Sequence, residues 1–144
     1  MATSARIGYG TLFASGNGAS PEIFTTLGEV TAITPPGWAR DTVDATHEQS
    51  PGAHREFIAG LADAGEVSMD INFVPGGAAT AALEAEKALT GSSAAINRRI
   101  TFPDGSYMTF VGILTAVEPD APIDDKMSAS VTLKVSGVPT FVQA

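Results

Sequence analysis

ITFPDGSYMTFVGILTAVEPDAPIDDKMSASVTLKVSGVPTF, residues Ile100 to Phe141, is the stretch of the chain that decides the fold. Its final run alternates between apolar side chains and serine, threonine or lysine. The apolar positions are Met127, Ala129, Val131, Leu133 and Val135. Successive side chains of a strand point to opposite faces, so this period of two predicts a strand with one buried and one solvated face.

The run Tyr107 to Val117 has a different pattern, because apolar side chains occupy both of its faces. One face carries Met108, Phe110, Leu114 and Ala116, and the other carries Tyr107, Val111, Ile113 and Val117. Such a strand is either central in a sandwich or covered by another subunit. Before it, Pro103-Asp104-Gly105 is a strong hairpin-turn signal that joins it to a predicted strand over Ile96 to Phe102.

The middle of the chain predicts one more alternating strand and one helix. Glu66 to Val74 places Val67, Met69, Ile71 and Phe73 on its inner face. Ala78 to Thr90 is rich in helix-favouring residues and is followed by Gly91, a common helix stop. The face expected to pack on the sheet consists of Ala78, Ala81, Ala82, Ala85, Ala88 and Leu89.

The first half of the chain is less clearly patterned. Short strands are predicted over Ile7 to Phe13, Phe24 to Ile33 and Arg40 to His47, the last of them polar and therefore at an edge or in solvent. Glu48 to Ala64 lacks periodicity, and long irregular segments in compact domains are usually functional, so it is a candidate interaction loop. Trp38 is expected to be a partly buried core residue, with a carbohydrate platform or an interface anchor as alternatives. The whole pattern predicts an α+β fold, mainly antiparallel β, with one helix.

Composition limits the classes of function. The 144 residues suit a single domain over 1–144, and a formal net charge of −8 disfavours DNA wrapping and docking on anionic membranes. The chain has no cysteine, which excludes disulfides and thiolate metal sites. Its N-terminus does not resemble a secretory signal, and no window approaches the ~20 apolar residues of a membrane helix.

No residue pattern points to catalysis, a cofactor or a metal. His47 and His54, near Glu48 and Glu56, could form a weak metal site, but two solvated loop histidines are the expected interpretation. The serines lack a nucleophile motif, and the acidic stretch from Glu118 to Asp125 lacks the ligand spacing of a calcium loop. We therefore expect no catalytic, cofactor or metal residues.

Arg98 and Arg99 are the only adjacent basic pair. Neighbouring residues of a strand point to opposite faces, so the two arginines cannot form one basic patch. One of them is expected to meet a carboxylate across a sheet edge or a subunit boundary.

The ordered motifs of the second half resemble the tail tube domain of lambda-type long-tailed phages. The chain shares with that family an I-x-F-P-D-G hairpin at Ile100 to Gly105 and an aromatic-x-G strand at Phe110 to Gly112. It also shares a closing strand of V-x-V-x-G-x-P type, here Leu133 to Pro139 with leucine at the first position, and the order of an alternating strand, Pro-Gly and helix. The resemblance covers about the last eighty residues in motifs and the rest in element order. A departure from the lambda type is also expected, since the sequence shows no second, immunoglobulin-like domain up to Ala144.

The resemblance implies a β-sandwich-like or barrel-like fold with one flanking helix. It further implies a structural virion protein, assembled in the host cytoplasm, whose hexameric rings stack into the tail tube. It also implies that DNA passes through the lumen without specific binding, that tape measure and terminator proteins are partners, and that no membrane is involved. The alternatives are a tail terminator or baseplate-hub ring protein of related fold, or a carbohydrate- or receptor-binding β-domain that uses Trp38, Tyr107 and Tyr9.

Under this interpretation, the candidate loop, the arm Ala2 to Arg6 and the second apolar face of the long strand form subunit contacts. The interface candidates are Glu48, His54, Phe57, Ile58, Tyr107, Val111 and Ile113. The lumen candidates are Ser68, Asp70 and Asn72, the outward residues of an alternating strand. An acidic lumen wall would repel phosphates and allow DNA to slide.

Overall fold

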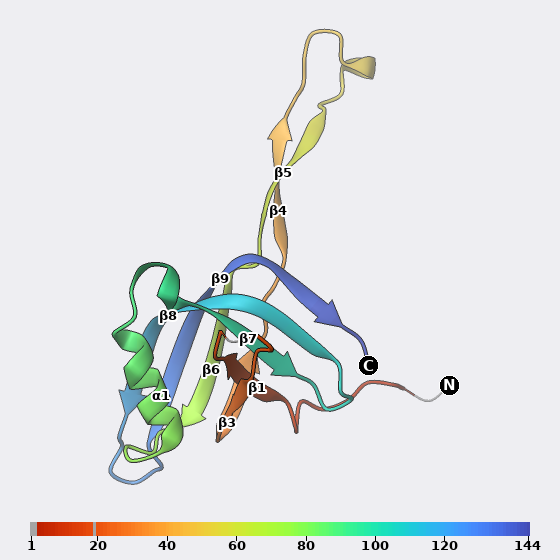
Figure 1. The fold of residues 1–144 in the computed structure, drawn as a ribbon. Coiled ribbons are helices and arrows are strands. Elements are labelled where there is room, and N and C mark those ends of the chain that lie inside the picture. Colours follow the sequence, from red (N-terminus) through yellow and green to blue (C-terminus); the bar gives the residue numbers. More distant parts are fainter. Residues whose placement is uncertain (1–2, 19) are drawn as a thin grey trace.

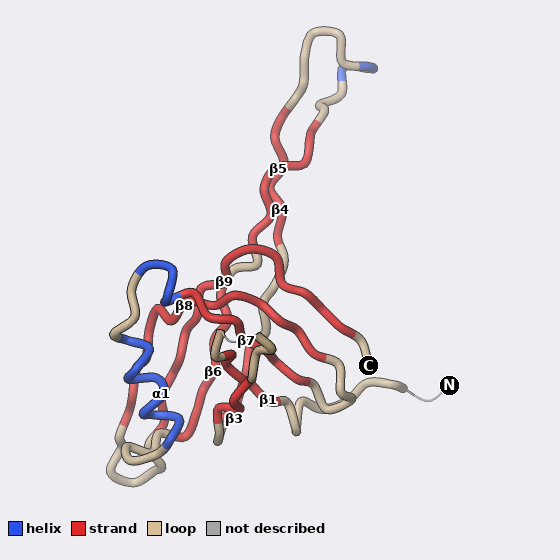
Figure 2. Tube along the Cα trace, in the orientation of Figure 1, coloured by secondary structure: helices blue, strands red, loops and turns tan. Residues whose placement is uncertain are grey.

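The computed structural model describes residues 3–18 and 20–144, and within them an antiparallel sheet, one helix and a long projecting hairpin (Figure 1). The strands of the sheet are β1 (Leu12–Gly16), β2 (Phe24–Leu27), β3 (Val30–Thr34), β6 (Glu66–Asn72), β7 (Ala95–Thr101), β8 (Tyr107–Asp120) and β9 (Ser128–Val142). The hairpin consists of β4 (Ala39–Asp44) and β5 (Phe57–Asp63), and the helix is α1 (Ala78–Lys87). Figure 2 shows the helix at one flank of the strands and a short 3-10 turn, Pro51–Ala53, near the tip of the hairpin.

The seven-stranded sheet is curled into an open barrel. Its strand order is β2-β1-β7-β8-β9-β6-β3, so β2 and β3 lie at its two ends. In a flat sheet, six spacings would separate those ends by about 29 Å. Only Gly28 and Glu29 join the two strands, and three Cα steps span at most about 11 Å. The sheet must therefore curl until its ends approach each other, which confirms the predicted barrel-like α+β fold.

The core lies on the inner face of the curled sheet, and β6 and β9 supply much of it. Val67, Met69 and Ile71 pair with Leu133, Val131 and Ala129, and none of these six is more than 3% exposed. The alternating pattern predicted this face correctly in both strands. Met127 is the exception, since it precedes β9 and is 38% exposed.

Strand β8 is longer than predicted, and an irregularity in it changes the assignment of its faces. The pairing register with β9 shifts between Leu114 and Ala116, which interrupts the alternation of side chains. Val117 consequently packs against the core opposite Val131, whereas Ala116 pairs with Thr132 on the outer face. The prediction for these two residues was wrong, because a bulge leaves no signature in a period-two pattern.

Helix α1 buries a different face from the one predicted. Leu83 is its buried residue and joins the core, while Ala79, Thr80 and Glu86 on the same side are half-buried. The predicted alanine face is exposed at every position: Ala78, Ala81, Ala82, Ala85, Ala88 and Leu89. Burying one leucine side chain removes more apolar area from water than burying any single alanine, which favours the rotation that turns Leu83 inward.

The N-terminal strands also differ from expectation. No strand covers Ile7 and Tyr9, which are 80% and 88% exposed, and β1 begins only at Leu12. The single strand expected over Phe24 to Ile33 is two strands, because Glu29 takes a left-handed conformation with φ 57°. Of the arm Ala2 to Arg6, Ala2 lies outside the described residues.

The segment Glu48 to Ala64 is not wholly irregular. Its second half is β5, which pairs with β4 from Asp44–Phe57 to Ala39–Asp63. The prediction of an exposed strand near Arg40 to His47 is confirmed by β4, which is exposed along its length. The core prediction for Trp38 was wrong: the side chain is 66% exposed at the base of the hairpin.

Candidate assembly surfaces

The β4–β5 hairpin projects away from the sheet and leaves its apolar side chains in solvent (Figure 1). Phe57 is 56% exposed and Ile58, the next residue, is 57% exposed. Adjacent strand residues point to opposite faces, so both faces of the hairpin present apolar surface. The other large apolar residues exposed in this segment are Trp38, Val43 and Leu61. An isolated two-stranded hairpin is marginally stable in water, so apolar exposure of this kind is typical of a surface that another molecule covers.

The tip of the hairpin is ordered by its own polar contacts. The Ser50 hydroxyl donates to Glu56 Oε2 at 2.7 Å, and His47 Nε2 lies 3.4 Å from the same carboxylate oxygen. The interface candidates Glu48 and His54 are exposed around this cluster. Within residues 3–18 and 20–144, no group of three or more acidic, histidine or cysteine side chains is arranged to hold a metal ion.

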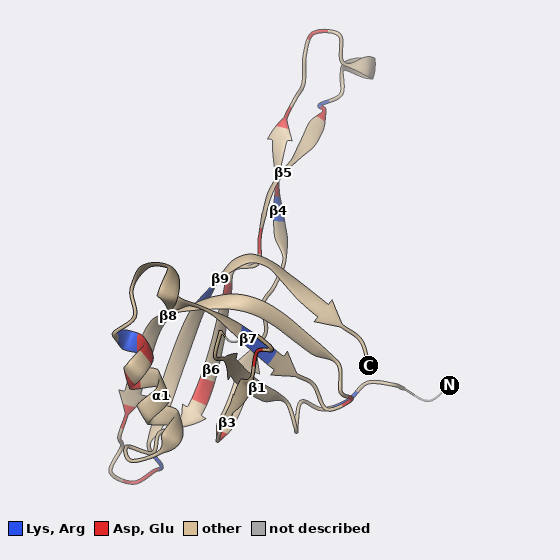
Figure 3. Ribbon diagram, viewed as in Figure 1, with Lys and Arg blue, Asp and Glu red and all other residues tan. Residues whose placement is uncertain are grey.

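The base of the hairpin is fixed to the sheet. The Gly37 N–H donates to the Ala64 carbonyl at 3.1 Å, and Lys134 Nζ on β9 lies 3.5 Å from Asp63 Oδ2. The backbone N–H of Gly65, and next the charge of Lys134, lower the pKa of Asp63 below its usual value. At the other end of the hairpin, hydrogen bonds from Thr46 lower the pKa of Asp44. These contacts give the hairpin a defined direction although its faces are uncovered. Charges of both signs lie along it (Figure 3).

The outer face of β7 and β8 forms a second apolar surface. Tyr107, Val111 and Ile113 lie on this face at alternate positions of β8 and are only half-buried in the single subunit. Arg99 of β7 lies between two aromatic rings, with its Cζ 4.1 Å from the ring centroid of Phe24 and 4.5 Å from that of Tyr107. We call Phe24, Arg99 and Tyr107 the arginine clamp.

A polar surface covers the outer side of β6, β9 and β8. The lumen candidates Ser68, Asp70 and Asn72 pair with Thr132, Ser130 and Ser128 of β9, respectively. On the other side of β9, Ser130 and Ser128 pair with Glu118 and Asp120 of β8. The Ser130 hydroxyl donates to Asp70 Oδ1 at 3.0 Å. The result is a surface of hydroxyl and carboxylate groups, with Lys134 at its end near the hairpin.

Arg98 points inward, opposite to Arg99, and ties the helix to the sheet. Its Nη1 donates to Glu86 Oε1 at 2.6 Å and to the Ser15 hydroxyl at 2.7 Å, and its Nε and Nη2 donate to the Gly112 carbonyl. The side chains of Arg98 and Glu86 are 2% and 13% exposed. Arg98 is therefore not the arginine expected to meet a carboxylate across an edge or a subunit boundary, because its partner Glu86 lies on the helix of the same subunit.

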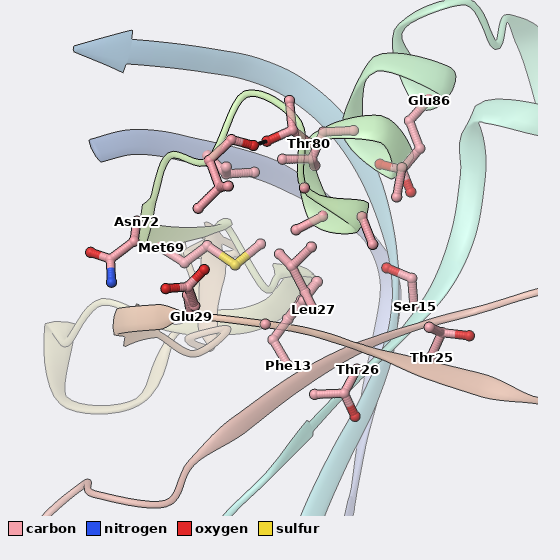
Figure 4. Close-up of a pocket in the computed structure, with 18 of the residues that line it drawn as sticks. Phe13, Ser15, Thr25, Thr26, Leu27, Glu29, Met69, Asn72, Thr80 and Glu86 are labelled. Atoms are coloured by element: carbon pink, nitrogen blue, oxygen red, sulfur yellow. Dashed lines mark hydrogen bonds between the residues drawn. The ribbon is translucent and has the colours of Figure 1, made fainter. Parts of the chain in front are cut away.

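A cavity of about 400 Å³ lies between α1 and the inner face of the sheet (Figure 4). Phe13, Leu27 and Met69 form much of its wall. The Thr80 hydroxyl at its rim donates to the Val74 carbonyl at 2.7 Å. Glu86 Oε1 accepts from Arg98, whereas Glu86 Oε2 is buried without a hydrogen-bond partner.

The structure separates the sequence-predicted interface residues into two groups. Glu48, His54, Phe57 and Ile58 belong to the hairpin, and Tyr107, Val111 and Ile113 belong to the outer face of β8. Of the lumen candidates, Ser68 and Asp70 are exposed on β6, whereas Asn72 at the end of that strand is half-buried, has a buried Oδ1 and lines the cavity. Sequence reasoning missed the arginine clamp, because Phe24 and Arg99 are far apart in the chain, and it missed Leu61, which lay in a segment without periodicity.

Comparison with known proteins adds a family and a fold. The family model described as lambda phage tail tube protein matches residues 6–142. A tail structure of an empty gene transfer agent particle, refined with C6 symmetry, aligns with a TM-score of 0.72 at 18% identity, covering 96% of this chain and 100% of that one. The cap that terminates the tube of the anti-feeding prophage aligns with a TM-score of 0.73 at 15% identity, covering 100% and 95%.

A sheath/tube terminator structure of an extracellular contractile injection system aligns with a TM-score of 0.72 at 10% identity, covering both chains fully. Among curated protein sequences, none matches the chain. In the described part of the chain, no helix has the length and apolarity that crossing a membrane requires.

Proposed function

Because the chain belongs to the lambda phage tail tube protein family, we propose that it assembles into stacked, sixfold rings that form the tube of a phage-like tail. It is a structural protein of a virion tail and forms homo-oligomers there. The observation that carries the proposal is the hairpin, whose apolar side chains are exposed on both faces although its base is fixed. A hairpin of this kind is stable when a neighbouring copy covers it.

We assign the contacts between rings to the hairpin and the contacts within a ring to the outer face of β7 and β8. A groove of about 1200 Å³ beside the open edge of β3 supports the first assignment. Its lining includes the exposed side chains of Ile7, Tyr9 and Phe141, which match the hairpin in apolar character. These are contacts between different surfaces of identical copies, and such contacts close into rings or extend into filaments.

We assign the lumen to the polar surface of β6, β9 and β8. Ser68 and Asp70 lie on it with Glu118 and Asp120, and carboxylates facing a channel repel the phosphates of passing DNA. DNA would then slide through without specific binding. As further partners we propose a tape measure protein and a terminator protein, and we propose that assembly takes place in the host cytoplasm. We also propose that the protein has no catalytic activity and that residues 1–144 form one domain.

The test is a variant that lacks the projecting hairpin. Arg40 and Ala62 are paired, so replacing residues 41–61 with Asn-Gly closes the same two strands with a tight turn. We expect the variant to keep the circular dichroism spectrum of a folded sheet and to lose tubes in negative-stain electron microscopy of concentrated protein. Long tubes from the truncated variant would refute the ring-stacking role of the hairpin.

A terminal ring is the second candidate function, since two of the similar structures are a tube terminator and a terminating cap. The same micrographs decide between the candidates, because a tube subunit gives long tubes and a terminator gives rings of fixed height. A carbohydrate-binding role has less support. Arg40 covers one face of Trp38 at 4.8 Å, and Arg99 covers one face of Tyr107 at 4.5 Å, which leaves each ring one face for a sugar.

A further inference from the structure

We propose that Arg99, held in the arginine clamp, binds a carboxylate of a neighbouring copy of this chain. The inference rests on the proposed ring assembly and names the polar contact that would fix the register between adjacent subunits. Two adjacent arginines differ in their partners. Arg98 pairs with a carboxylate of its own subunit, whereas Arg99 has no carboxylate partner among the described residues.

The clamp orients the Arg99 side chain but leaves its charge without a counterion. The rings of Phe24 and Tyr107 lie at 4.1 and 4.5 Å from its Cζ, which restricts the planar guanidinium to one orientation. Its Nε is buried and has no hydrogen-bond partner. In contrast to Nε, the atoms Nη1 and Nη2 are not buried and unpaired, so both can donate, side by side, to the two oxygens of an incoming carboxylate.

The nearby carboxylate of the same subunit is already engaged. Glu22 lies by the neighbouring outward residue, Asn97, whose Nδ2 donates to Glu22 Oε1 at 2.8 Å. Glu22 Oε2 accepts the backbone N–H of Gly18 at 2.9 Å. Both oxygens of Glu22 are thus held by other donors, and Glu22 forms no ion pair with Arg99 among the described residues, so we look for the partner of Arg99 outside the subunit.

The charge of the chain favours a second copy as the source of that carboxylate. The sequence has 16 acidic residues against 8 basic ones, so the surface of a neighbouring copy is rich in unpaired carboxylates. The half-buried side chains of Val111 and Ile113 continue the same face and become apolar contact area when a copy covers them. Exclusion of water there strengthens the ion pair. Nucleic acid is a poorer fit, because phosphate backbones are bound by several cations, and the outward residues of β7 and β8 include one, Arg99.

The first test uses the Arg99→Lys variant, which keeps the charge and supplies an amine. Tubes are formed from equal amounts of unlabelled and ¹⁵N-labelled protein and treated with a carbodiimide, which joins amines to carboxylates in direct contact. Mass spectrometry should find the amine introduced at position 99 linked to a carboxylate peptide in mixed-isotope pairs. Lys87–Glu84 at 2.7 Å and Lys134–Asp63 at 3.5 Å are internal controls that should appear in same-isotope pairs.

Two results would overturn the inference. In one, the introduced amine is linked only to Glu22 of its own copy; in the other, it forms no link although both controls react. If the wild-type protein still forms tubes when the variant gives either result, the proposed function stands and only the inference on Arg99 fails. A wild-type protein that forms neither rings nor tubes at any concentration would instead defeat the proposed function.

The second test does not depend on assembly of the lysine variant. Arg99→Gln should raise the critical concentration for tube formation roughly tenfold or more, since it removes one side of a covered charge pair. Lys87→Gln, which removes an exposed cation from α1, is the matched control and should leave that concentration unchanged. Equal critical concentrations for both variants would contradict the inference. So would normal assembly of Arg99→Gln combined with a loss of binding to a short DNA duplex, which would assign Arg99 to a phosphate.

Discussion

Val131 shows how strictly the inner face of the sheet excludes charge. The side chain is 0% exposed, and it pairs with Met69 on β6 and Val117 on β8. Val131→Asp buries an unpaired carboxylate at a cost of several kcal/mol, against a total stability of roughly 5–15 kcal/mol for a domain of this size. We expect the variant to lose cooperative thermal unfolding in circular dichroism. Val138→Asp, at a site 88% exposed, is the control and should melt as the wild type does.

Asp104 gives the β7–β8 turn a dependence on acid. The backbone N–H of Ser106 donates to its carboxylate at 2.9 Å and lowers the pKa of Asp104 below its usual value of 3.8. A lowered pKa in the folded state means that this contribution to stability is present above the unfolded pKa and is lost as pH falls through the folded one. Asp104→Asn keeps an acceptor but cannot titrate there.

Between pH 6 and pH 2, the melting temperature of Asp104→Asn should therefore fall less steeply than that of the wild type, with the difference confined to the region below about pH 4. Thermal melts at matched ionic strength measure both slopes. Parallel pH profiles of the two proteins would show that the Ser106 contact does not favour the charged form.

At the scale of elements, the buried Arg98–Glu86 pair fixes α1 on the sheet. Removing one member of a buried pair leaves the other charge without compensation, which costs about 3 kcal/mol. Glu86→Ala should therefore lower the melting temperature by roughly 10 °C. Glu84→Ala breaks the exposed pair with Lys87 on the same helix and should lower stability by less than about 1 kcal/mol. Equal melting temperatures for the two variants would mean that the buried pair does not hold the helix.

The turn between β2 and β3 is a second element with a measurable strain. Glu29 has φ 57°, a left-handed backbone conformation that is unfavourable for residues with a Cβ atom. Its carbonyl accepts a hydrogen bond from the Asn72 N–H at 2.9 Å. Glu29→Gly should raise the free energy of unfolding by about 0.5–1 kcal/mol, because relief of strain exceeds the added entropy of the unfolded chain.

Gly65→Ala is the converse substitution, because it adds a Cβ atom at a residue with positive φ, whereas Glu29→Gly removes one. Gly65 has φ 74° and open space around its Cβ position, so alanine adds backbone strain without a clash. Urea denaturation should show it to be destabilised. A loss of stability in Glu29→Gly would indicate that contacts of the glutamate side chain outweigh the strain.

At the scale of the whole molecule, the net charge of −8 opposes assembly of identical copies. Raising the ionic strength from 0.01 M to 0.15 M shortens the screening length from about 30 Å to about 8 Å. Salt therefore weakens the long-range repulsion between copies, whereas it weakens a covered ion pair, such as the one proposed for Arg99, much less. The sedimenting fraction should increase with salt at fixed protein concentration. A decrease would show that attractive charge pairs dominate the interface.

The sequence by itself determined the fold class, the inner faces of β6 and β9, the β7–β8 hairpin and the position of the helix. These features depend on local periodicity and turn chemistry, which a single sequence records. It also placed Tyr107, Val111 and Ile113 on one face of β8, and Ser68, Asp70 and Asn72 on one face of β6. Its motifs were enough to indicate the tail tube family.

Only the tertiary structure decided the features that depend on partners distant in the chain. It split Phe24 to Ile33 between the two ends of one sheet, turned Leu83 inward instead of the alanine face, and paired β5 with β4. It also brought Phe24, Arg99 and Tyr107 together on the outer face. Strand pairing, bulges and helix rotation are chosen by the total apolar area buried and by hydrogen bonds between distant strands, and neither leaves a local pattern.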